Sequence, residues 1–362
     1  SGWRRRGEAG SRTSRKQFHS EWLGMTYGIA KRLGVTRLWY QGVTGKGILV
    51  GVVGTGIDQT HHDLEGRILT AKDFSTKGIQ DDLGHDTAVA SIIASKGAKN
   101  WRQRGIAYEA QLAIAKVTQA DGSTEEDVLI DALEWLASQG VHIINFSIVS
   151  DVVTDGKDPV SREVNYLVEK KGIGVVCAAG NYGPSHYSIG SPGAAEEAIT
   201  VGCVNSRDVL RLASSRGPTL DGRVKPDCVA PGERIFAARA KETYSCDVHG
   251  DHYGFFDLTS FATPHVTGIY ALLKQAFPKA TLDQIKHAIL KSCDPAYMPV
   301  ISKIAALPGG FLYRLKASLK RLFTRKKFDE KYSLGYGRVN AYQAFLKLKE
   351  LMKENGEGKE RT

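Results

Sequence analysis

Leu-Thr-Ser-Phe-Ala-Thr-Pro-His-Val-Thr-Gly, residues 258–268, is the stretch around which this 362-residue chain is organised. It leads into an apolar run at helical spacing: Val266, Ile269, Leu272 and Leu273. This spacing predicts a helix that begins near Ser260, with Pro264 in its first turn, where a missing N–H costs little. A serine at a helix start lies beside unpaired backbone N–H groups and the positive end of the helix dipole. That position suits an oxygen that develops negative charge, although an N-capping serine on a core helix fits the same pattern.

Strand-like and helix-like segments alternate along the chain. Apolar runs typical of buried strands cover residues 47–53, 112–117, 141–148, 173–179 and 199–204, and helical patterns cover residues 85–94, 123–138 and 164–171. This alternation predicts an α/β fold whose mostly parallel sheet has helices on both faces. Sites in such sheets form at the carboxyl ends of strands. Gly54, Ser147 and Asn181 all follow predicted strands, so we expect them to meet at one edge of the sheet.

The composition excludes several classes of protein. Hydrophobic residues make up 42% of the chain and charged residues 24%, which is ordinary for a globular domain. No apolar run is long enough to cross a bilayer. Five scattered cysteines argue against a disulfide framework, and Cys177 and Cys203 fall in strand-like runs as small buried side chains.

Because the chain begins at Ser1, we expect any signal or pro-segment to have been removed.

The net charge of +10 is concentrated in two segments. Residues 1–20 carry six basic residues and one acid, and residues 311–327 carry seven basic residues and no acid. The rest of the chain is nearly neutral, which does not indicate specific nucleic-acid binding. We expect residues 1–20 to be a flexible tail, residues 21–350 to be one domain with a basic helical insertion at about 296–332, and residues 351–362 to be a polar tail. The leucines of residues 311–327 fit either packing on the domain or docking to an anionic membrane or acidic partner.

Three segments carry side chains suited to nucleophilic catalysis. His85 begins a predicted helix, Asn181 follows a predicted strand, and Ser260 supplies a hydroxyl. A serine nucleophile needs a base for its proton and a donor for the oxyanion. Histidine titrates near neutrality and an asparagine amide donates hydrogen bonds, so His85 and Asn181 suit these two tasks. Taken singly, a buried core histidine and a turn asparagine explain these residues as well.

With these motifs the chain resembles the subtilisin-like serine proteases, or subtilases. The resemblance runs from about residue 46 to residue 293 and resumes at residues 334–341. It depends on ordered motifs at residues 53–58, 84–90, 144–147, 179–181, 215–218, 224–227, 230–232 and 259–265. It implies a subtilisin-like three-layer fold and a peptide or protein substrate.

Carried over by position, the resemblance implies that Ser260 is the nucleophile, His85 the general base and Asn181 the oxyanion donor. It implies substrate contacts by a further set of residues: Ser147, Ile148, Val149, Ala179, Gly180 and Leu258. By analogy with most relatives, it also implies a secreted or extracytoplasmic protein. Some relatives bind calcium, but residues 96–104 are basic where those relatives have a calcium loop. We therefore expect no metal and no other cofactor.

The third member of the subtilase triad is missing from its usual position. Relatives have an aspartate just before Thr-Gly-Ile, and this chain has Gly54 there. Asp58 would lie roughly 13 Å away along an extended chain, and residues 81–82 would have to fold back. Asp86 follows His85 on a helix, where successive side chains point about 100° apart. We therefore expect no replacement acid, and a water molecule facing His85.

Other departures from the family pattern fall in the substrate cleft. Leu258 replaces a glycine, residues 147–150 replace a glycine-rich segment, and Asp86 and Ala88 stand where a glycine and a second histidine are usual. Added Cβ atoms would narrow the cleft, and loss of the aspartate alone lowers kcat by about four orders of magnitude. The sequence predicts a serine endopeptidase with an incomplete triad, slow or restricted to a specialised or self-processing cleavage. The alternative is an inactive pseudoprotease that binds peptides or acts as a scaffold.

One further group has the spacing of metal ligands. Cys246, His249 and His252 precede the nucleophile closely. No second pair of ligands with suitable spacing accompanies them, so we interpret the group as a surface loop rather than a zinc site.

Overall fold

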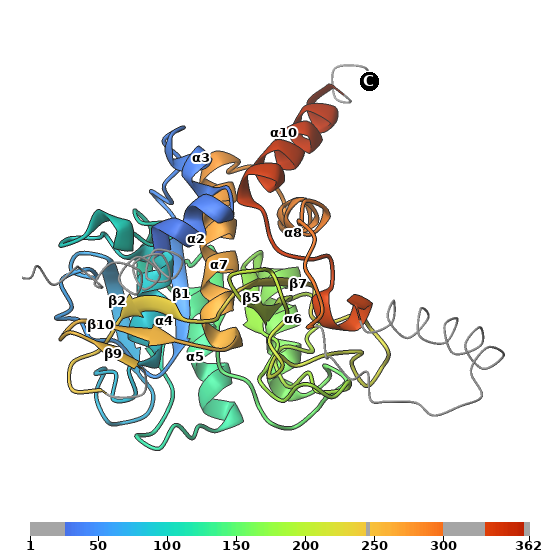
Figure 1. Cartoon of the computed structure of the whole chain (residues 1–362). Coiled ribbons are helices and arrows are strands. Elements are labelled where there is room, and N and C mark those ends of the chain that lie inside the picture. Colours follow the sequence, from blue (N-terminus) through green and yellow to red (C-terminus); the bar gives the residue numbers. More distant parts are fainter. Residues whose placement is uncertain (1–25, 244–246, 300–329, 358–362) are drawn as a thin grey trace, which may run out of the picture.

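A seven-stranded parallel sheet lies at the centre of the fold (Figure 1). The computed structural model describes residues 26–243, 247–299 and 330–357. The strands are β1 (Leu49–Gly54), β2 (Ile68–Asp73), β3 (Gln111–Lys116), β4 (Ile143–Phe146), β5 (Gly174–Ala178), β6 (Ile199–Val204) and β7 (Cys228–Pro231). Their order across the sheet is β2-β3-β1-β4-β5-β6-β7, and every neighbouring pair is parallel. The predicted α/β class is confirmed.

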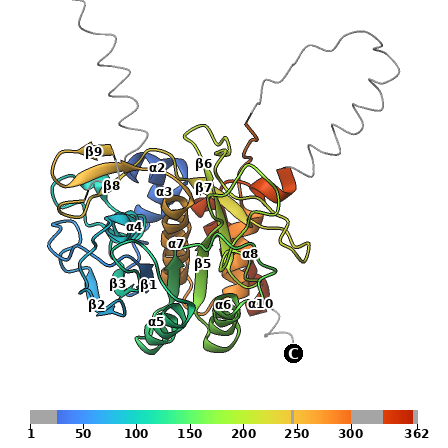
Figure 2. The ribbon, with the colours of Figure 1, turned by 90° about the horizontal axis from the view of Figure 1, so that it is seen from below.

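Helices cover both faces of this sheet. On one face lie α4 (His85–Ala94) and α7 (Thr259–Ala276), and on the other lie α5 (Glu126–Ser138) and α6 (Pro159–Lys171), which Figure 2 shows side by side. Alternate side chains of β1 pack on opposite faces of the sheet, because successive side chains of a strand point in opposite directions. Val50 and Val52 pack in the α4 and α7 core, whereas Leu49 and Val53 pack in the α5 and α6 core. The predicted three layers are therefore present.

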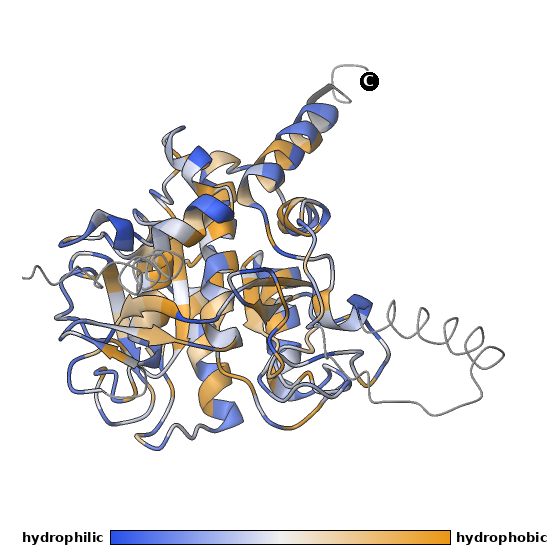
Figure 3. Ribbon diagram, in the orientation of Figure 1, coloured by the Kyte–Doolittle hydropathy of each residue, from blue (hydrophilic) through white to orange (hydrophobic). Residues whose placement is uncertain are grey.

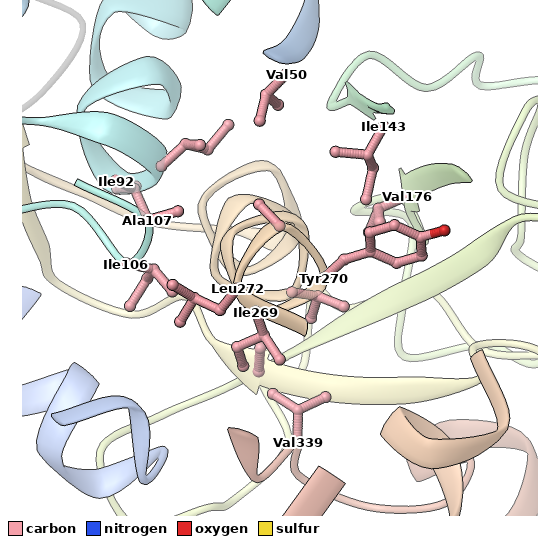
Figure 4. Close-up of a cluster of buried hydrophobic side chains, with 14 of the residues drawn as sticks. Val50, Ile92, Ile106, Ala107, Ile143, Val176, Ile269, Tyr270, Leu272 and Val339 are labelled. Atoms are coloured by element: carbon pink, nitrogen blue, oxygen red, sulfur yellow. The ribbon is translucent and has the colours of Figure 1, made fainter. Parts of the chain in front are cut away.

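Helix α7 runs through the centre of the larger core. Ile269, Tyr270 and Leu272 are almost fully buried there, and Figure 4 shows Ile92 and Ile106 packed around the same helix. The helix predicted to begin near Ser260 begins at Thr259, which confirms that prediction. The placement of Pro264 in the first turn is wrong, because it is the sixth residue of α7.

The sequence predicted neither strands β2 and β7 nor the remaining elements. They are α2 (Thr26–Arg32), α3 (Val35–Trp39), the 3₁₀ turn η1 (Trp101–Gln103), α8 (Leu282–Lys291) and α10 (Ala341–Glu357). A small antiparallel sheet of β8 (Ile235–Ala238), β9 (Asp247–His249) and β10 (Tyr253–Phe256) has the order β8-β10-β9. Figure 3 shows hydrophobic and hydrophilic residues alternating along α10, as expected of a helix with one packed face. The domain boundary predicted at residue 350 falls inside this helix.

Several predictions concern residues outside those that the structure describes. They are the tail at 1–20, the basic segment at 311–327 and Cys246. The four cysteines within the described ranges are free, and Cys177 and Cys203 are fully buried as expected. No helix of the described ranges combines the length and the apolar character needed to cross a membrane.

Candidate active site

The carboxyl ends of three strands and the beginnings of two helices meet at one pocket. Strands β1, β4 and β5 end at Gly54, Phe146 and Ala178, and α4 and α7 begin at His85 and Thr259. The pocket has a volume of about 250 Å³, and its lining includes the side chains proposed for catalysis: His85, Asn181 and Ser260. Residues more than 170 positions apart in the sequence are therefore brought together at the predicted edge of the sheet.

The predicted substrate contacts divide into two groups. Ser147, Ile148 and Val149 line the pocket, whereas Ala179, Gly180 and Leu258 are absent from the lining given by the described residues. Ala179 is buried in a small apolar cluster behind it. Sequence reasoning missed five lining residues: Thr55, Leu83, Thr118, Gly122 and Tyr182. Of these, Thr55 lies inside a motif that was recognised, and its position after β1 would have been the signal.

Ser260 is held in place by reciprocal bonds to Ser147. The Ser260 hydroxyl donates to the Ser147 carbonyl at 3.0 Å, and the Ser147 hydroxyl donates to the Ser260 carbonyl at 3.0 Å. Pro264 has no N–H to give that Ser260 carbonyl, so the Ser147 hydroxyl supplies the missing donor. Asn145 donates to Ser147 at 2.9 Å and accepts from Thr267 at 2.9 Å. This buried chain fixes the first turns of α7 to the end of β4.

The orientation of Asn181 is set by α7. Its amide oxygen accepts from the backbone N–H of Thr259 at 3.1 Å and from the Thr259 hydroxyl at 2.9 Å. The oxygen is therefore used as a cap for the beginning of α7. The NH₂ on the other branch of the amide is the part of this side chain that can donate to a ligand in the pocket.

Leu258, directly before α7, has a strained backbone. Its φ of 95° and ψ of 176° lie in a region that is almost exclusive to glycine. This conformation explains why relatives have glycine at this position. A leucine here stores strain two residues from the nucleophile.

His85 faces a carboxylate rather than water. Nδ1 of His85 lies 2.6 Å from Oδ1 of Asp86, whose side chain is fully buried. The expectation that Asp86 points away from His85 is wrong. The 100° between neighbours describes the Cα–Cβ directions on a helix, but the ring and the carboxylate extend beyond their Cβ atoms and converge. Because His85 is the first residue of α4, after Gly84 with a φ of 76°, its ring lies at the open end of the helix.

Gly54 leaves the space that this carboxylate fills. A Cβ built on Gly54 would lie 2.1 Å from Oδ2 and 2.5 Å from Oδ1 of Asp86, far inside van der Waals contact. No positive φ is involved at Gly54, so the lack of a side chain there matters for room and not for backbone freedom.

Thr55 and Asp81 hold the Asp86 carboxylate in position. The Thr55 backbone N–H donates to Oδ2 of Asp86 at 2.9 Å, and the Asp86 N–H donates to the Thr55 hydroxyl at 3.0 Å. That hydroxyl donates in turn to Asp81 at 2.8 Å. Asp81 also accepts from the N–H of Gly84 and from both the N–H and the hydroxyl of Thr87. The end of β1 and the beginning of α4 are thus fixed together by two buried acids.

The electrostatics of this pair favour a protonated imidazole. Burial opposes the charge on His85, but the hydrogen bond to Asp86 and the negative charges of Asp86 and Asp81 outweigh it, so the pKa of His85 is raised. The pKa of Asp81 is raised by burial and by the charge of Asp86. An imidazole that receives a proton during a reaction would be stabilised here.

Outside the pocket, three histidines gather between the loop after β1 and the turn between β9 and β10. The ring nitrogens of His61, His62 and His252 lie within 4.8 Å of one another. His252 thus lies beside His61 and His62, whereas Cys246, with which sequence spacing grouped it, lies outside the described residues. The ring of His249 instead contacts Phe236 and Phe255.

Comparison with known proteins gives consistent results. The family model described as "Subtilase family" matches residues 45–337. The chain is 37% identical over 279 residues to serine protease AprX of Bacillus subtilis (strain 168), covering 70% of this chain and 63% of AprX. It is 32% identical over 277 residues to subtilisin E of the same organism, covering 75% of this chain and 66% of subtilisin E. The chain therefore spans just under two thirds of the length of either relative.

The fold has a solved counterpart. The structure of the prenylagaramide maturation protease PagA matches with a TM-score of 0.66 at 21% identity, covering 87% of this chain and 98% of PagA. At this identity the match supports the fold alone. Together with the family match over residues 45–337 and the identities to two serine proteases, these observations show that the chain belongs to the subtilase family.

Proposed function

We propose that this chain is a serine endopeptidase that cleaves peptide bonds through Ser260. The observation that carries the proposal is the common pocket that Ser260, His85 and Asn181 line at the carboxyl edge of the sheet. Family membership supports the same reaction, because the relative AprX is named a serine protease.

The side chains can divide the reaction between them. The Ser260 oxygen attacks the peptide carbonyl while Nε2 of His85 takes the hydroxyl proton, and the same imidazolium then protonates the leaving amine. The Asn181 NH₂ and the positive end of α7 stabilise the oxyanion, and one such donor contributes about 10²–10³-fold to kcat. Water then hydrolyses the acyl-enzyme by the reverse sequence, with His85 again as the base.

Reaction requires one rearrangement of the resting site. The Ser260 hydroxyl donates to the Ser147 carbonyl at 3.0 Å, so its single proton must turn toward His85 before transfer. Rotation about the Cβ–Oγ bond redirects this proton, and catalytic hydrogen bonds often form fully only with substrate bound.

The shape of the pocket supports a restricted substrate range. Its volume of about 250 Å³ is below the range of about 300–1,000 Å³ that is common for ligand pockets. Leu83, Ile148 and Val149 give it apolar walls. We infer slow or specialised cleavage, after small apolar side chains, rather than general digestion.

A pseudoprotease is the second candidate. Two observations favour it: the Ser260 hydroxyl is bonded to Ser147 rather than to His85, and Leu258 holds a strained conformation beside the nucleophile. On this account the pocket binds a peptide segment and leaves it intact.

Labelling with a fluorophosphonate separates the two candidates. Wild type and Ser138→Ala, a control at an exposed serine of α5 outside the pocket lining, should be labelled, and Ser260→Ala should not. Mass spectrometry of products from a random peptide library then reports the cleavage position. Failure of the probe to label wild type after long incubation would favour the pseudoprotease.

A further inference from the structure

We propose that Asp86 is the acid of the catalytic triad, in the role that relatives give to an aspartate at the position of Gly54. This inference depends on the proposed function, because it assigns a partner to the base of that reaction. Its geometric basis is the 2.6 Å contact between Oδ1 of Asp86 and Nδ1 of His85, together with the space at Gly54 that the carboxylate fills.

Asp86 meets the physical requirements of the role. The triad acid holds the histidine in the tautomer with hydrogen on Nδ1 and stabilises the imidazolium that forms. A contact of 2.6 Å to a fully buried carboxylate is short and charge-assisted. With Nδ1–H of His85 donating to Asp86, the Nε2 lone pair remains for the Ser260 proton.

The carboxylate is also anchored independently of the histidine. Its second oxygen accepts the backbone N–H of Thr55, the residue directly after Gly54. A buried carboxylate needs such donors to stay charged, and a fixed backbone N–H also fixes its direction. The acid thus enters from α4 and is attached to the same strand end that carries it in relatives.

Gly54 and Asp86 depend on each other. Any side chain at position 54 would start 2.1 Å from Oδ2 of Asp86, so two acids cannot be present together without displacing one another. A glycine at position 86, the usual residue in relatives, would leave His85 without an acid in this chain. The glycine at position 54 is therefore a requirement of the altered triad rather than a loss of function.

The test compares four variants in the full chain. Asp86→Asn keeps the shape and removes the charge, and Asp86→Gly removes the acid. The double variant Gly54→Asp/Asp86→Gly returns an acid from the strand side. The control is Asp82→Asn, an acid paired with Lys116 at 2.7 Å. The readouts are kcat on a peptide cleaved by wild type and the pKa of His85 from the NMR shifts of its ring protons.

We expect Asp86→Asn to lower kcat by about 10⁴-fold and to lower the pKa of His85. The double variant should exceed Asp86→Gly by at least about 10²-fold, and Asp82→Asn should resemble wild type. The inference is overturned if Asp86→Asn keeps kcat within about tenfold of wild type and leaves the pKa of His85 unchanged. An inert wild type would instead refute the proposed function, and with it any catalytic role of Asp86.

An independent observation carries a second inference: the geometry points to a zinc site formed by His61, His62 and His252. The rings of His61 and His62 are stacked with centroids 4.5 Å apart, and the ring of His252 stands edge-on to both. Their nitrogens lie within 4.8 Å of one another. Zn²⁺ binds imidazole nitrogens at about 2.0–2.1 Å in tetrahedral geometry, which places two such nitrogens about 3.3 Å apart. The most distant pair of nitrogens therefore has to approach by about 1.5 Å.

The surroundings suit a divalent cation. Tyr253 lies 3.0 Å from Nε2 of His62 and donates to Asp63 at 2.9 Å, an outer group of the kind that orients metal ligands. Zinc at Nε2 of His61 would replace the bond from that nitrogen to the carbonyl of His252 at 2.9 Å. Because Nδ1 would then carry the proton, the bond from the N–H of Asp63 to Nδ1 at 3.2 Å would be lost as well.

Calorimetric titration of the full chain with zinc sulfate tests the site. Wild type and His287→Ala, a control at an exposed histidine of α8, should bind one ion with the same affinity. His62→Ala and His252→Ala should each lose more than about tenfold in affinity. Equal binding by wild type, His62→Ala and His252→Ala would overturn the site, as would the absence of binding by wild type.

Discussion

The dependence between Gly54 and Asp86 makes a single methyl group a severe change. In Gly54→Ala the new Cβ would lie 2.1 Å from Oδ2, 2.5 Å from Oδ1 and 2.6 Å from Cγ of Asp86. The backbone at position 54 is compatible with alanine, because its φ is outside the left-handed region. The whole cost therefore comes from moving the carboxylate.

The size of that cost follows from what the carboxylate contacts. Overpacking a dense interior costs about 1–3 kcal/mol. A displaced Asp86 also weakens its bonds to the Thr55 N–H and to His85, and hydrogen bonds to a charged group contribute about 1.5–3 kcal/mol each. Since the side chain can keep part of these contacts, we expect Gly54→Ala to lose about 3 kcal/mol of the free energy of unfolding.

In an Asp86→Gly background the same methyl enters empty space. Alanine in a strand interior is then favoured over glycine by about 0.5–1 kcal/mol. Urea unfolding of wild type, both single variants and the double variant gives the coupling free energy of the cycle. We expect about 3.5–4 kcal/mol of coupling between the two positions, which is the loss in wild type plus the gain in the Asp86→Gly background. Additivity within about 0.5 kcal/mol would refute the assignment of the carboxylate to this space.

Three further predictions follow from the same site. The pKa of His85 is raised, and only the neutral ring accepts the Ser260 proton. We therefore expect kcat/KM to rise with pH through a midpoint above the pKa of an ordinary histidine. A pH–rate profile with its midpoint at or below that ordinary value would contradict this prediction. Leu258→Gly should raise the free energy of unfolding by about 1 kcal/mol in urea by releasing strain, whereas Leu258→Ala, which keeps the Cβ, should not. Asn181→Ala and Asn181→Asp should both lower kcat by about 10²–10³-fold. Only the alanine variant should lose the hydrogen bond to the N–H of Thr259 and therefore unfold at a lower urea concentration. Equal unfolding midpoints for the two variants would contradict the capping role of Asn181.

Much of the fold could be predicted because its signals are local. β6 and α4 have the bounds that residues 199–204 and 85–94 predict, and α7 begins within one residue of Ser260. Strands β7 to β10 were missed because each is four residues or fewer, too short for periodicity to show. The convergence of His85, Asn181 and Ser260 followed from family resemblance and from the rule that sites form at strand ends.

The parts of the site that could not be predicted depend on contacts between distant segments. The distance from Asp86 to His85 is set by ring and carboxylate torsions that residue spacing does not report. The histidine cluster joins positions about 190 residues apart, so spacing along the chain could not bring His252 together with His61 and His62. The reciprocal bonds of Ser147 and Ser260 likewise connect β4 with α7 across 113 positions.

The two positions of the acid also suggest how such a triad should be recognised. What the imidazole requires is a carboxylate oxygen within hydrogen-bond reach of Nδ1, held there by a fixed donor and shielded from water. An aspartate on β1 meets that requirement from the strand, and Asp86 meets it from α4, with the Thr55 N–H as its fixed donor. A sequence motif that requires an acid at position 54 detects only triads whose acid lies on β1. A search for a carboxylate within reach of Nδ1 detects an acid on either element. It also adds a condition that the motif lacks. When the acid directly follows the histidine, the strand must end in glycine, because any Cβ there would occupy the place of the carboxylate.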